Sequence, residues 1–298
     1  MHGTPLLFSD LLRQFTTWLT RLGYAKSTIK GYQNHLKAFL SWLTTQKINH
    51  IQLVTQPLLE QYNAHLHQRK KLTTTGCLSS RYIQSHIYIL SLLDQYLQLT
   101  RQIKLLQGKI KVTPTLFKPR AILTQEEVQS LYAATNNSLL GYRDRACLAL
   151  FYGCGLRRTE GANVELKHIH YEQRLLQVLP GKTKKERYVP MSQVVIEDIK
   201  RYEQESRPYL FNNKNHNYLI VSNKGNPITP GSIGNFLAPL LAETNITKTI
   251  SLHNLRHTIA THLLQSGMEL TQISRFLGHK SLDSTQIYTH IANALHDG

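Results

Sequence analysis

Three short segments in the second half of the chain carry side chains that could act together on an anion. They are Gly155-Leu156-Arg157-Arg158-Thr159-Glu160, His253-Asn254-Leu255-Arg256-His257 and Leu277-Gly278-His279, with Tyr288 nine residues after the last histidine. His253 and Arg256 are three positions apart on an expected helix, so both side chains project from one face and can converge on one anion. A single H-x-x-R pattern is more often a surface arginine beside a half-buried histidine, and an isolated tyrosine is more often a packing residue. The joint occurrence of the segments, in this order, favours a shared site.

The overall charge favours a partner that is rich in phosphate. The chain has 35 Lys+Arg against 18 Asp+Glu, a net charge of +17 with histidine counted as neutral. Lysine and arginine displace condensed counterions when they neutralise a nucleic-acid backbone. A merely basic protein, or one that binds anionic membrane, would have the same balance.

Several other classes of protein are not indicated. The sequence has no run of about 18 apolar residues and no N-terminal charged and then apolar segment with a cleavage site, so we expect neither membrane insertion nor export. Cys77, Cys147 and Cys154 form neither an even disulfide set nor a C-x-x-C pair, which favours a reducing cytoplasm. The 15 histidines lack zinc-site spacings and there is no phosphate-binding loop, so we expect no metal and no nucleotide cofactor.

The first part of the chain, over about residues 1–105, predicts a small all-helical domain. Hydrophobic residues recur there at a spacing of three to four, which is typical of amphipathic helices. Gly23 is expected to end the first helix, and Ser27 to cap the second. The expected helices cover residues 8–22, 28–43, 57–67 and 79–99.

Basic residues lie on these helices and in the segment that follows them. Lys26 and Lys30 belong to a basic exterior, which fits contact with DNA but also an ordinary solvated face. Glycine and proline alternate with lysine and arginine over residues 106–120, where Lys118 and Arg120 lie. We therefore expect a basic interdomain linker there.

From residue 121 to residue 298 the pattern is mixed but mainly helical, with a small β-hairpin. Two short apolar strands are expected at 175–179 and 188–190, joined through the turn Gly181-Lys182-Thr183-Lys184-Lys185. The expected helices cover residues 124–135, 141–152, 192–206, 230–243, 254–266, 270–277 and 281–290.

The motifs of this second part resemble those of the tyrosine recombinases of the phage integrase family, in particular the simple two-domain Xer-like and integrase branch. The matching motifs are Gly-Leu-Arg-x-x-Glu at 155–160, His-x-Leu-Arg-His-x-x-Ala-Thr-His at 253–262, Leu-Gly-His at 277–279 and Thr-x-x-Tyr-Thr-His at 285–290. The resemblance covers nearly the whole chain. It implies a mainly α two-domain DNA clamp: an all-α core-binding (SAM-like) domain, a linker, and a mixed α+β catalytic domain with a small sheet.

The resemblance implies a role for each residue that matches a motif. Arg157 matches the first catalytic arginine, Lys182 the β-hairpin lysine, His253 and Arg256 the His-x-x-Arg pair, His279 the second histidine and Tyr288 the nucleophile. Glu160 is expected to orient Arg157 rather than to act on DNA.

Neighbouring residues offer alternatives to three of these assignments. They are Arg158 for Arg157, Lys184 or Lys185 for Lys182, and His257 for His253. Lys184, Lys185 and Arg187 are expected either to contact backbone phosphates or to solvate the hairpin.

The chemistry that the resemblance implies explains these residue types. Attack of the Tyr288 oxygen on a phosphodiester adds negative charge to the nonbridging oxygens, where Arg157 and Arg256 can each offer a planar fork of donors. A tyrosine with an ordinary pKa near 10 is a poor nucleophile at neutral pH, so His279 or His253 should accept or orient its proton. Lys182 would protonate the departing 5′ oxygen, which leaves a 3′-phosphotyrosyl link and needs neither metal nor ATP.

The family also implies an assembly of four protomers on two double-stranded DNA sites, with strands exchanged through a Holliday junction. Only ten residues follow Tyr288, so we expect weak association without DNA and a monomer in solution. Integration and excision of a mobile element and resolution of replicon dimers both remain open as roles. The rival classes are a DNA-binding regulator that has lost catalysis and a type IB topoisomerase. The complete set of catalytic residues argues against the regulator. The separate helical domain and the Leu-Gly-His motif argue against the topoisomerase.

Overall fold

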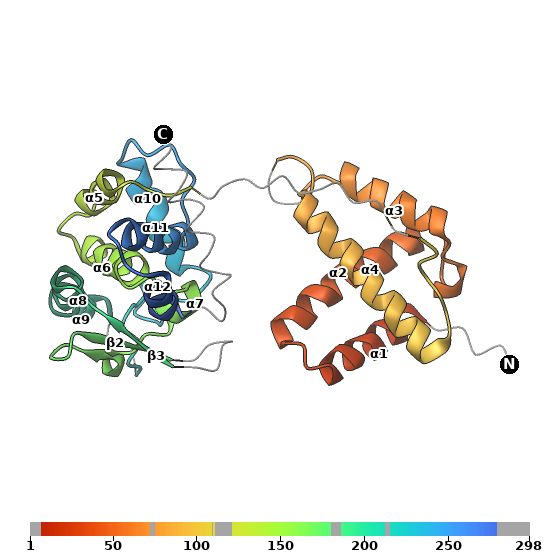
Figure 1. Cartoon of the computed structure of the whole chain (residues 1–298), viewed down its shortest axis with the longest axis horizontal. Helices are drawn as coiled ribbons and strands as arrows, with labels where there is room; N and C mark the ends of the chain where they lie inside the picture. The colour runs from red at the N-terminus through yellow and green to blue at the C-terminus, as the bar shows by residue number, and fades with distance from the viewer. Residues whose placement is uncertain are drawn as a thin grey trace. The chain divides into compact units, whose positions relative to one another are not determined.

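The structure consists of two compact units, each with a hydrophobic core of its own. It is a computed structural model that describes residues 7–71, 75–108, 110, 121–179, 186–211 and 215–278. The division falls between Met1–Lys118 and Pro119–Gly298 (Figure 1).

The described part of the first unit is built on α-helices. They are α1 (Phe8–Arg21), α2 (Lys26–Thr45), α3 (Gln56–Gln68) and α4 (Ser80–Arg101), with a 3-10 turn, η1 (Ile51–Leu53), before α3. Leu11, Phe15 and Leu19 lie one turn apart on α1 and are completely buried, as the sequence pattern predicts. Helix α4 contacts each of the other three, so its apolar face forms the centre of this core.

The helix ends agree with the sequence in one place and differ in another. Gly23, two residues after the end of α1, has a φ of +79°, the left-handed conformation in which glycine commonly ends a helix. The expectation that Ser27 caps the second helix was wrong. Helix α2 begins one residue before it, at Lys26, because the N-cap position falls on Ala25, whose carbonyl accepts from the Ile29 amide. Ser27 therefore lies inside the first turn.

The first unit extends into the segment that we expected to be linker. The buried carboxylate of Asp94 on α4 accepts hydrogen bonds from the backbone amides of Leu105 (2.7 Å) and Leu106 (3.0 Å). Leu105 is buried, and Leu106 and Ile110 pack against the same core. The chain is thus held to the helical unit beyond residue 105.

The described part of the second unit is mainly helical, with a small antiparallel sheet in the order β1-β2-β3. Its strands are β1 (Ile169–His170), β2 (Leu175–Val178) and β3 (Arg187–Pro190), and Val178 faces Arg187 across the β2–β3 pair. Its α-helices are α5 (Gln125–Ala133), α6 (Leu139–Leu148), α7 (Arg158–Ala162), α8 (Gln193–Glu205), α9 (Arg207–Phe211), α10 (Leu237–Ala242), α11 (Leu252–Gln265) and α12 (Leu270–Leu277).

Two helices expected in the second unit differ from the structure. The helix expected over 141–152 becomes α-helix only as far as Leu148, and Ala149–Gly153 (η2) is a π-helix, where the Cys154 amide donates to the Ala149 carbonyl five residues earlier. The helix expected over 230–243 begins as a 3-10 turn, η4 (Ile233–Phe236), before α10. The helix expected over 281–290 lies outside the described residues. A further 3-10 turn, η3 (Leu166–His168), precedes β1.

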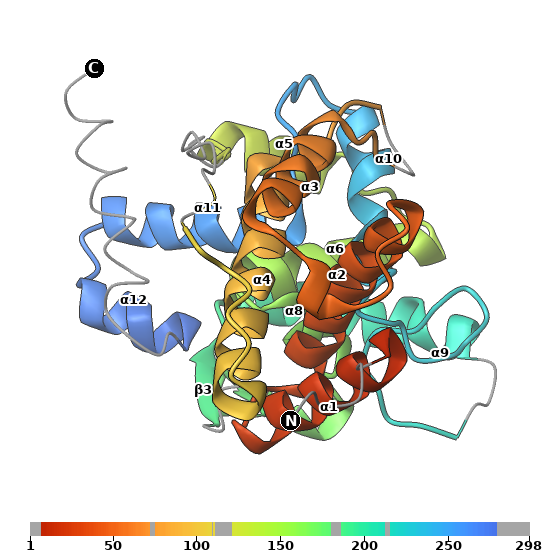
Figure 2. The same cartoon turned by 90° about the vertical axis from the view of Figure 1, so that its right-hand side faces the viewer.

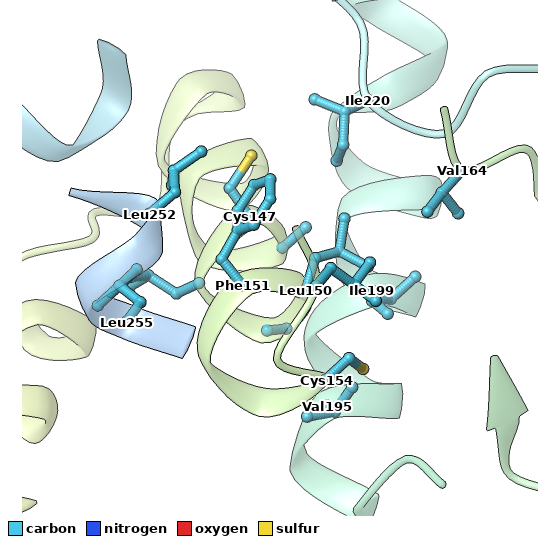
Figure 3. Close-up of a cluster of buried hydrophobic side chains, with 14 of the residues drawn as sticks. Cys147, Leu150, Phe151, Cys154, Val164, Val195, Ile199, Ile220, Leu252 and Leu255 are labelled. Atoms are coloured by element: carbon cyan, nitrogen blue, oxygen red, sulfur yellow. The ribbon is translucent and has the colours of Figure 1, made fainter. Parts of the chain in front are cut away.

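The core of the second unit is formed where α6 and η2 pack against α8 and α11. Figure 3 shows Cys147, Leu150 and Phe151 in this layer, between Leu252 and Leu255 of α11 on one side and Ile199 of α8 on the other. Both Cys147 and Cys154 are buried there, whereas Cys77 in the first unit is exposed. Burial raises the pKa of both thiols, to about 12 for Cys154 and higher for Cys147, so both stay protonated at neutral pH.

Helices α11 and α12 lie side by side, and α12 ends beside β3 (Figures 1 and 2). This packing brings the carboxyl end of α12 to the same place as the first residue of β3. No helix among the described residues is long and apolar enough to cross a membrane. The mainly α fold with a small antiparallel sheet confirms the fold class predicted from the sequence.

Candidate active site

Arg157 enters the site from a short connection between η2 and α7. The π-helix ends at Gly153, and Gly155 has a φ of +58°, so the chain turns sharply before Arg157. A Cβ at Gly155 would lie 2.9 Å from a methyl carbon of Leu277, which is closer than side chains approach. Glycine is therefore required here both by the backbone conformation and by the close approach of α12.

Glu160 lies in the first turn of α7 and is bound by arginines from three different elements. Arg157 donates to it through Nη1 (2.7 Å) and through its backbone amide (2.8 Å). Arg187 on β3 forms a bidentate pair with both carboxylate oxygens, at 3.1 and 2.9 Å. Arg256 on α11 approaches within 3.9 Å. We call Arg157, Arg187 and Arg256 around Glu160 the arginine cluster.

The cluster keeps Glu160 ionised although its side chain is only 7% exposed. Burial alone would raise the pKa of the carboxyl group. The hydrogen bonds and positive charge of Arg187, and then the hydrogen bonds from Arg157, outweigh that effect and lower the pKa to about 2. Glu160 is thus a fixed negative charge at neutral pH.

The same three arginines also hold the carboxyl end of α12. Arg187 Nε donates to the Phe276 carbonyl (3.0 Å), Arg256 Nη2 to the Leu277 carbonyl (2.6 Å) and Arg157 Nη2 to the Gly278 carbonyl (2.7 Å). Carbonyl groups at the end of a helix lack partners within the helix and carry a partial negative charge. The arginines satisfy them and fix the point where the chain continues to residue 279.

Arg157 and Arg256 differ in how open they are. The side chain of Arg157 is 33% exposed, whereas that of Arg256 is 3% exposed and donates to the Gly155 carbonyl (2.5 Å) as well as to Leu277. Arg158, the alternative to Arg157, is exposed and has no hydrogen bond to Glu160. The arginine that meets Arg256 on Glu160 is therefore Arg157.

His253 lies on the first turn of α11, at the edge of a cavity of about 650 Å³ that Arg157 and Arg158 also line. Its Nε2 atom is 3.0 Å from Nε2 of His257, so one ring donates a proton to the other. The two histidines proposed for the same role are therefore hydrogen-bonded neighbours, and His253 is the one that lines the cavity.

The remaining predicted site residues lie on the first unit or outside the described residues. Lys26 and Lys30 are exposed and one turn apart on α2. Lys118, Arg120, Lys182, Lys184, Lys185, His279 and Tyr288 lie outside the described residues. Among the residues that the structure does describe, no three His, Cys, Asp or Glu side chains are grouped as metal ligands.

The placement of Arg187 differs from that expected of a side chain that solvates the hairpin. Its side chain is 13% exposed, and its donors are directed to Glu160 and to the Phe276 carbonyl rather than to solvent. The alternation along β3 carries a signal for this placement, since Arg187 shares a face with the buried Val189, two positions on.

Comparisons with known proteins identify the family of the chain and agree with its fold. Residues 121–294 match the phage integrase family. The chain is 31% identical to the tyrosine recombinase XerD of Lacticaseibacillus casei over 306 aligned positions, covering 98% of this chain and 95% of that protein. It is 30% identical to XerD of Staphylococcus saprophyticus over 273 residues, covering 91% and 90%.

A solved structure of the Tn1549 transposon integrase in complex with transposon right end DNA has the same fold, with a TM-score of 0.73 at 17% identity over 95% of this chain and 94% of that one. The chain belongs to the phage integrase family of tyrosine recombinases, and its relatives place it with the Xer-like members. The resemblance drawn from the sequence motifs is thereby confirmed.

Proposed function

We propose that this chain is a site-specific DNA recombinase that cuts and rejoins DNA strands through Tyr288, without metal or ATP. The observation that carries the proposal is that Arg157 and Arg256, far apart in the sequence, meet on the carboxylate of Glu160. Two fixed guanidinium groups at one place suit the nonbridging oxygens of a single phosphate. Because the chain belongs to the tyrosine recombinases, we take this phosphate to be the scissile phosphodiester of a DNA strand.

The first step is attack of the Tyr288 oxygen on the phosphorus of a phosphodiester. A bond forms between the tyrosine oxygen and phosphorus, the bond to the 5′ oxygen breaks, and the 3′ side of the DNA stays attached to the protein. Negative charge increases on the nonbridging oxygens, where Arg157 and Arg256 donate hydrogen bonds that strengthen in the transition state. Arg157, which is the more exposed of the two, provides the first contact for an incoming phosphate.

Two proton transfers accompany the step. The tyrosine proton passes to a histidine, His279 or His253, because an ordinary phenol is protonated at neutral pH. Lys182 gives a proton to the departing 5′ oxygen. Rejoining reverses these events: a 5′ hydroxyl attacks the phosphotyrosyl bond and Tyr288 leaves, so the bond energy is kept and no nucleotide is consumed.

The proposed architecture places a DNA duplex between the helical core-binding unit (Met1–Lys118) and the catalytic unit (Pro119–Gly298). Exposed Lys26 and Lys30 on α2, together with Lys118, Arg120, Lys184 and Lys185, neutralise backbone phosphates. Four protomers assemble on two sites and exchange strands through a Holliday junction in the cytoplasm, and the protein without DNA is a monomer.

A neutral phosphate tests the role of the two arginines. In a methylphosphonate substrate a methyl group replaces one charged nonbridging oxygen at the scissile position, so less negative charge needs to be stabilised. We expect Arg157→Ala and Arg256→Ala to cleave ordinary DNA about 10²–10³-fold more slowly than the wild type, which is typical of lost transition-state donors. On the methylphosphonate both variants should recover most of that loss.

Lys248→Ala is a suitable control, because Lys248 pairs with Glu127 on the same unit and contacts no residue of the arginine cluster. It should cleave both substrates like the wild type. If the arginine variants show the same defect on both substrates, the arginines do not stabilise phosphate charge, and this part of the proposal is wrong.

A further inference from the structure

Arg187 stands where three parts of the proposed active site meet. It is the first residue of β3, directly after the segment that contains Lys182 in the sequence. Its guanidinium group binds Glu160, which binds Arg157, and its Nε binds the Phe276 carbonyl at the end of α12. His279 follows three residues after Phe276 in the sequence.

The contacts of Arg187 require the shape of an arginine. All three of its nitrogen atoms donate, two to the carboxylate and one to a carbonyl from another element. A lysine has a single ammonium group and cannot span the same partners in a fixed geometry. A Cβ added at Gly278 would lie 2.9 Å from both Cδ and Nη1 of Arg187, so the arginine also packs directly against the end of α12.

Removing Arg187 would change the environment of Glu160 more than removing either of the other two arginines would. The arginine supplies the largest of the interactions that lower the pKa of this buried carboxyl group. Without it, Glu160 retains Arg157 and the more distant Arg256 as partners, and the Phe276 carbonyl loses its donor. Both changes act on groups that the proposed reaction needs in a fixed place.

We propose that Arg187 is a positioning residue of the recombinase active site, which fixes Arg157 through Glu160 and fixes the carboxyl end of α12 through the Phe276 carbonyl. The inference rests on the proposed function and extends it to a residue that touches no DNA. Arg187 aligns groups from the β2–β3 hairpin, α7 and α12, so that the donors for the phosphate and the chain leading to His279 stay in register.

Single-turnover cleavage and DNA affinity separate this role from DNA contact. The probe is a suicide duplex that carries a site selected from randomised DNA by covalent capture with the wild-type protein. We expect Arg187→Ala to cleave about 10²-fold more slowly, the effect of a displacement on the order of 1 Å at a reacting group. Affinity for DNA should stay within about threefold of the wild type, because the proposed role of Arg187 involves no contact with DNA.

Two further variants test the route through Glu160. Arg187→Lys keeps the charge but not the geometry, and we expect it to recover only a small part of the rate. Glu160→Ala and the double variant Arg187→Ala/Glu160→Ala complete a double-mutant cycle. The losses in cleavage rate of the two single variants should not add, because both changes release Arg157. Full recovery in Arg187→Lys, or additive losses in the cycle, would overturn the inference.

Arg145→Ala is the matched control for a merely structural effect. Arg145 is also a partly buried arginine of the second unit, paired with a buried carboxylate (Nε to Asp198 Oδ1, 2.8 Å), but it contacts no member of the arginine cluster. At conditions where both variants are fully folded, Arg145→Ala should cleave like the wild type. Equal rates for Arg145→Ala and Arg187→Ala would assign Arg187 to stability alone.

Amide hydrogen exchange of the DNA-free protein gives a readout that does not depend on recombination. The Arg157 amide donates to Glu160, so its exchange should become faster in Arg187→Ala and stay unchanged in Arg145→Ala. An unchanged Arg157 amide would contradict the inference even if cleavage fell. If the wild type forms no covalent adduct with any DNA, the proposed function fails, while the exchange result still decides whether Arg187 holds Glu160.

Discussion

Replacing Glu160 by glutamine removes the carboxylate that the arginine cluster shares while it keeps the shape of the side chain. The pKa of this group falls from 4.5 to about 2 in the folded protein. At about 1.4 kcal/mol for each pKa unit, the ionised form stabilises the folded state by about 3 kcal/mol at neutral pH. The side chain is only 7% exposed, so solvent screening removes little of this energy.

The effect of Glu160→Gln should depend on pH in a direction that the pKa shift fixes. Because the folded-state pKa is the lower one, the stabilisation is complete above about pH 4.5 and is lost as the pH falls from 4.5 towards 2. The variant should thus be about 3 kcal/mol less stable than the wild type at pH 7. The difference narrows below pH 4.5, because the carboxyl group of the unfolded wild type takes up a proton there while that of the folded protein stays ionised.

Urea unfolding of both proteins at a series of pH values, followed by circular dichroism and by hydrogen exchange of peptides from the second unit, measures this difference. The chain has two tryptophans, Trp18 and Trp42, and both lie in the first unit, so tryptophan emission is an internal control that should not change. Equal stability of the two proteins at pH 7, or a difference that stays constant down to pH 3, would refute the account of Glu160.

Two further predictions concern Lys182 and Gly278, and a third concerns the net charge of the chain. Lys182→Ala should cleave ordinary DNA about 10²–10⁴-fold more slowly but regain much of its rate when sulfur replaces the bridging 5′ oxygen, since a thiolate leaves without a proton. Equal defects on both substrates would assign Lys182 to positioning DNA. Rescue of Lys184→Ala instead would make Lys184 the general acid. Gly278→Ala should cost about 1–2 kcal/mol for its left-handed φ of +65° and should also slow cleavage by displacing Arg187, whereas Gly267→Ala, at φ +88° with open space around it, should show the stability loss alone. Affinity for DNA should fall steeply with salt in a titration, since the net charge of +17 favours contact with many phosphates; a flat salt dependence would contradict this.

The sequence predicted much of the first unit because its helices are amphipathic and depend on local spacing. Leu11, Phe15 and Leu19 repeat on one face of α1, and this pattern alone indicates both the helix and its buried side. The start of α2 was missed by two residues, since Ala25 offers no side chain that marks an N-cap.

The second unit departs from its pattern where tertiary contacts override local preference. The π-helix at Ala149–Gly153 overlaps a continuous apolar run, residues 146–152, that is equally compatible with an α-helix. The two residues of β1 are too few to show an alternation. The family motifs predict that Arg157 and Arg256 lie in one site. The burial of Arg187, in contrast, depends on where β3 meets Glu160 and α12, and no local sequence pattern indicates this contact.

The central claim is that Tyr288 becomes covalently joined to DNA, and the most direct measurement is capture of that bond. Wild-type protein is incubated with a nicked suicide duplex, the products are denatured, and the DNA-linked peptide is identified by mass spectrometry after nuclease and protease digestion. The account predicts a denaturant-resistant adduct with the nucleotide on Tyr288, and no adduct in Tyr288→Phe although that variant still binds the duplex. An adduct that persists in Tyr288→Phe, or a linked peptide that lacks Tyr288, would contradict it.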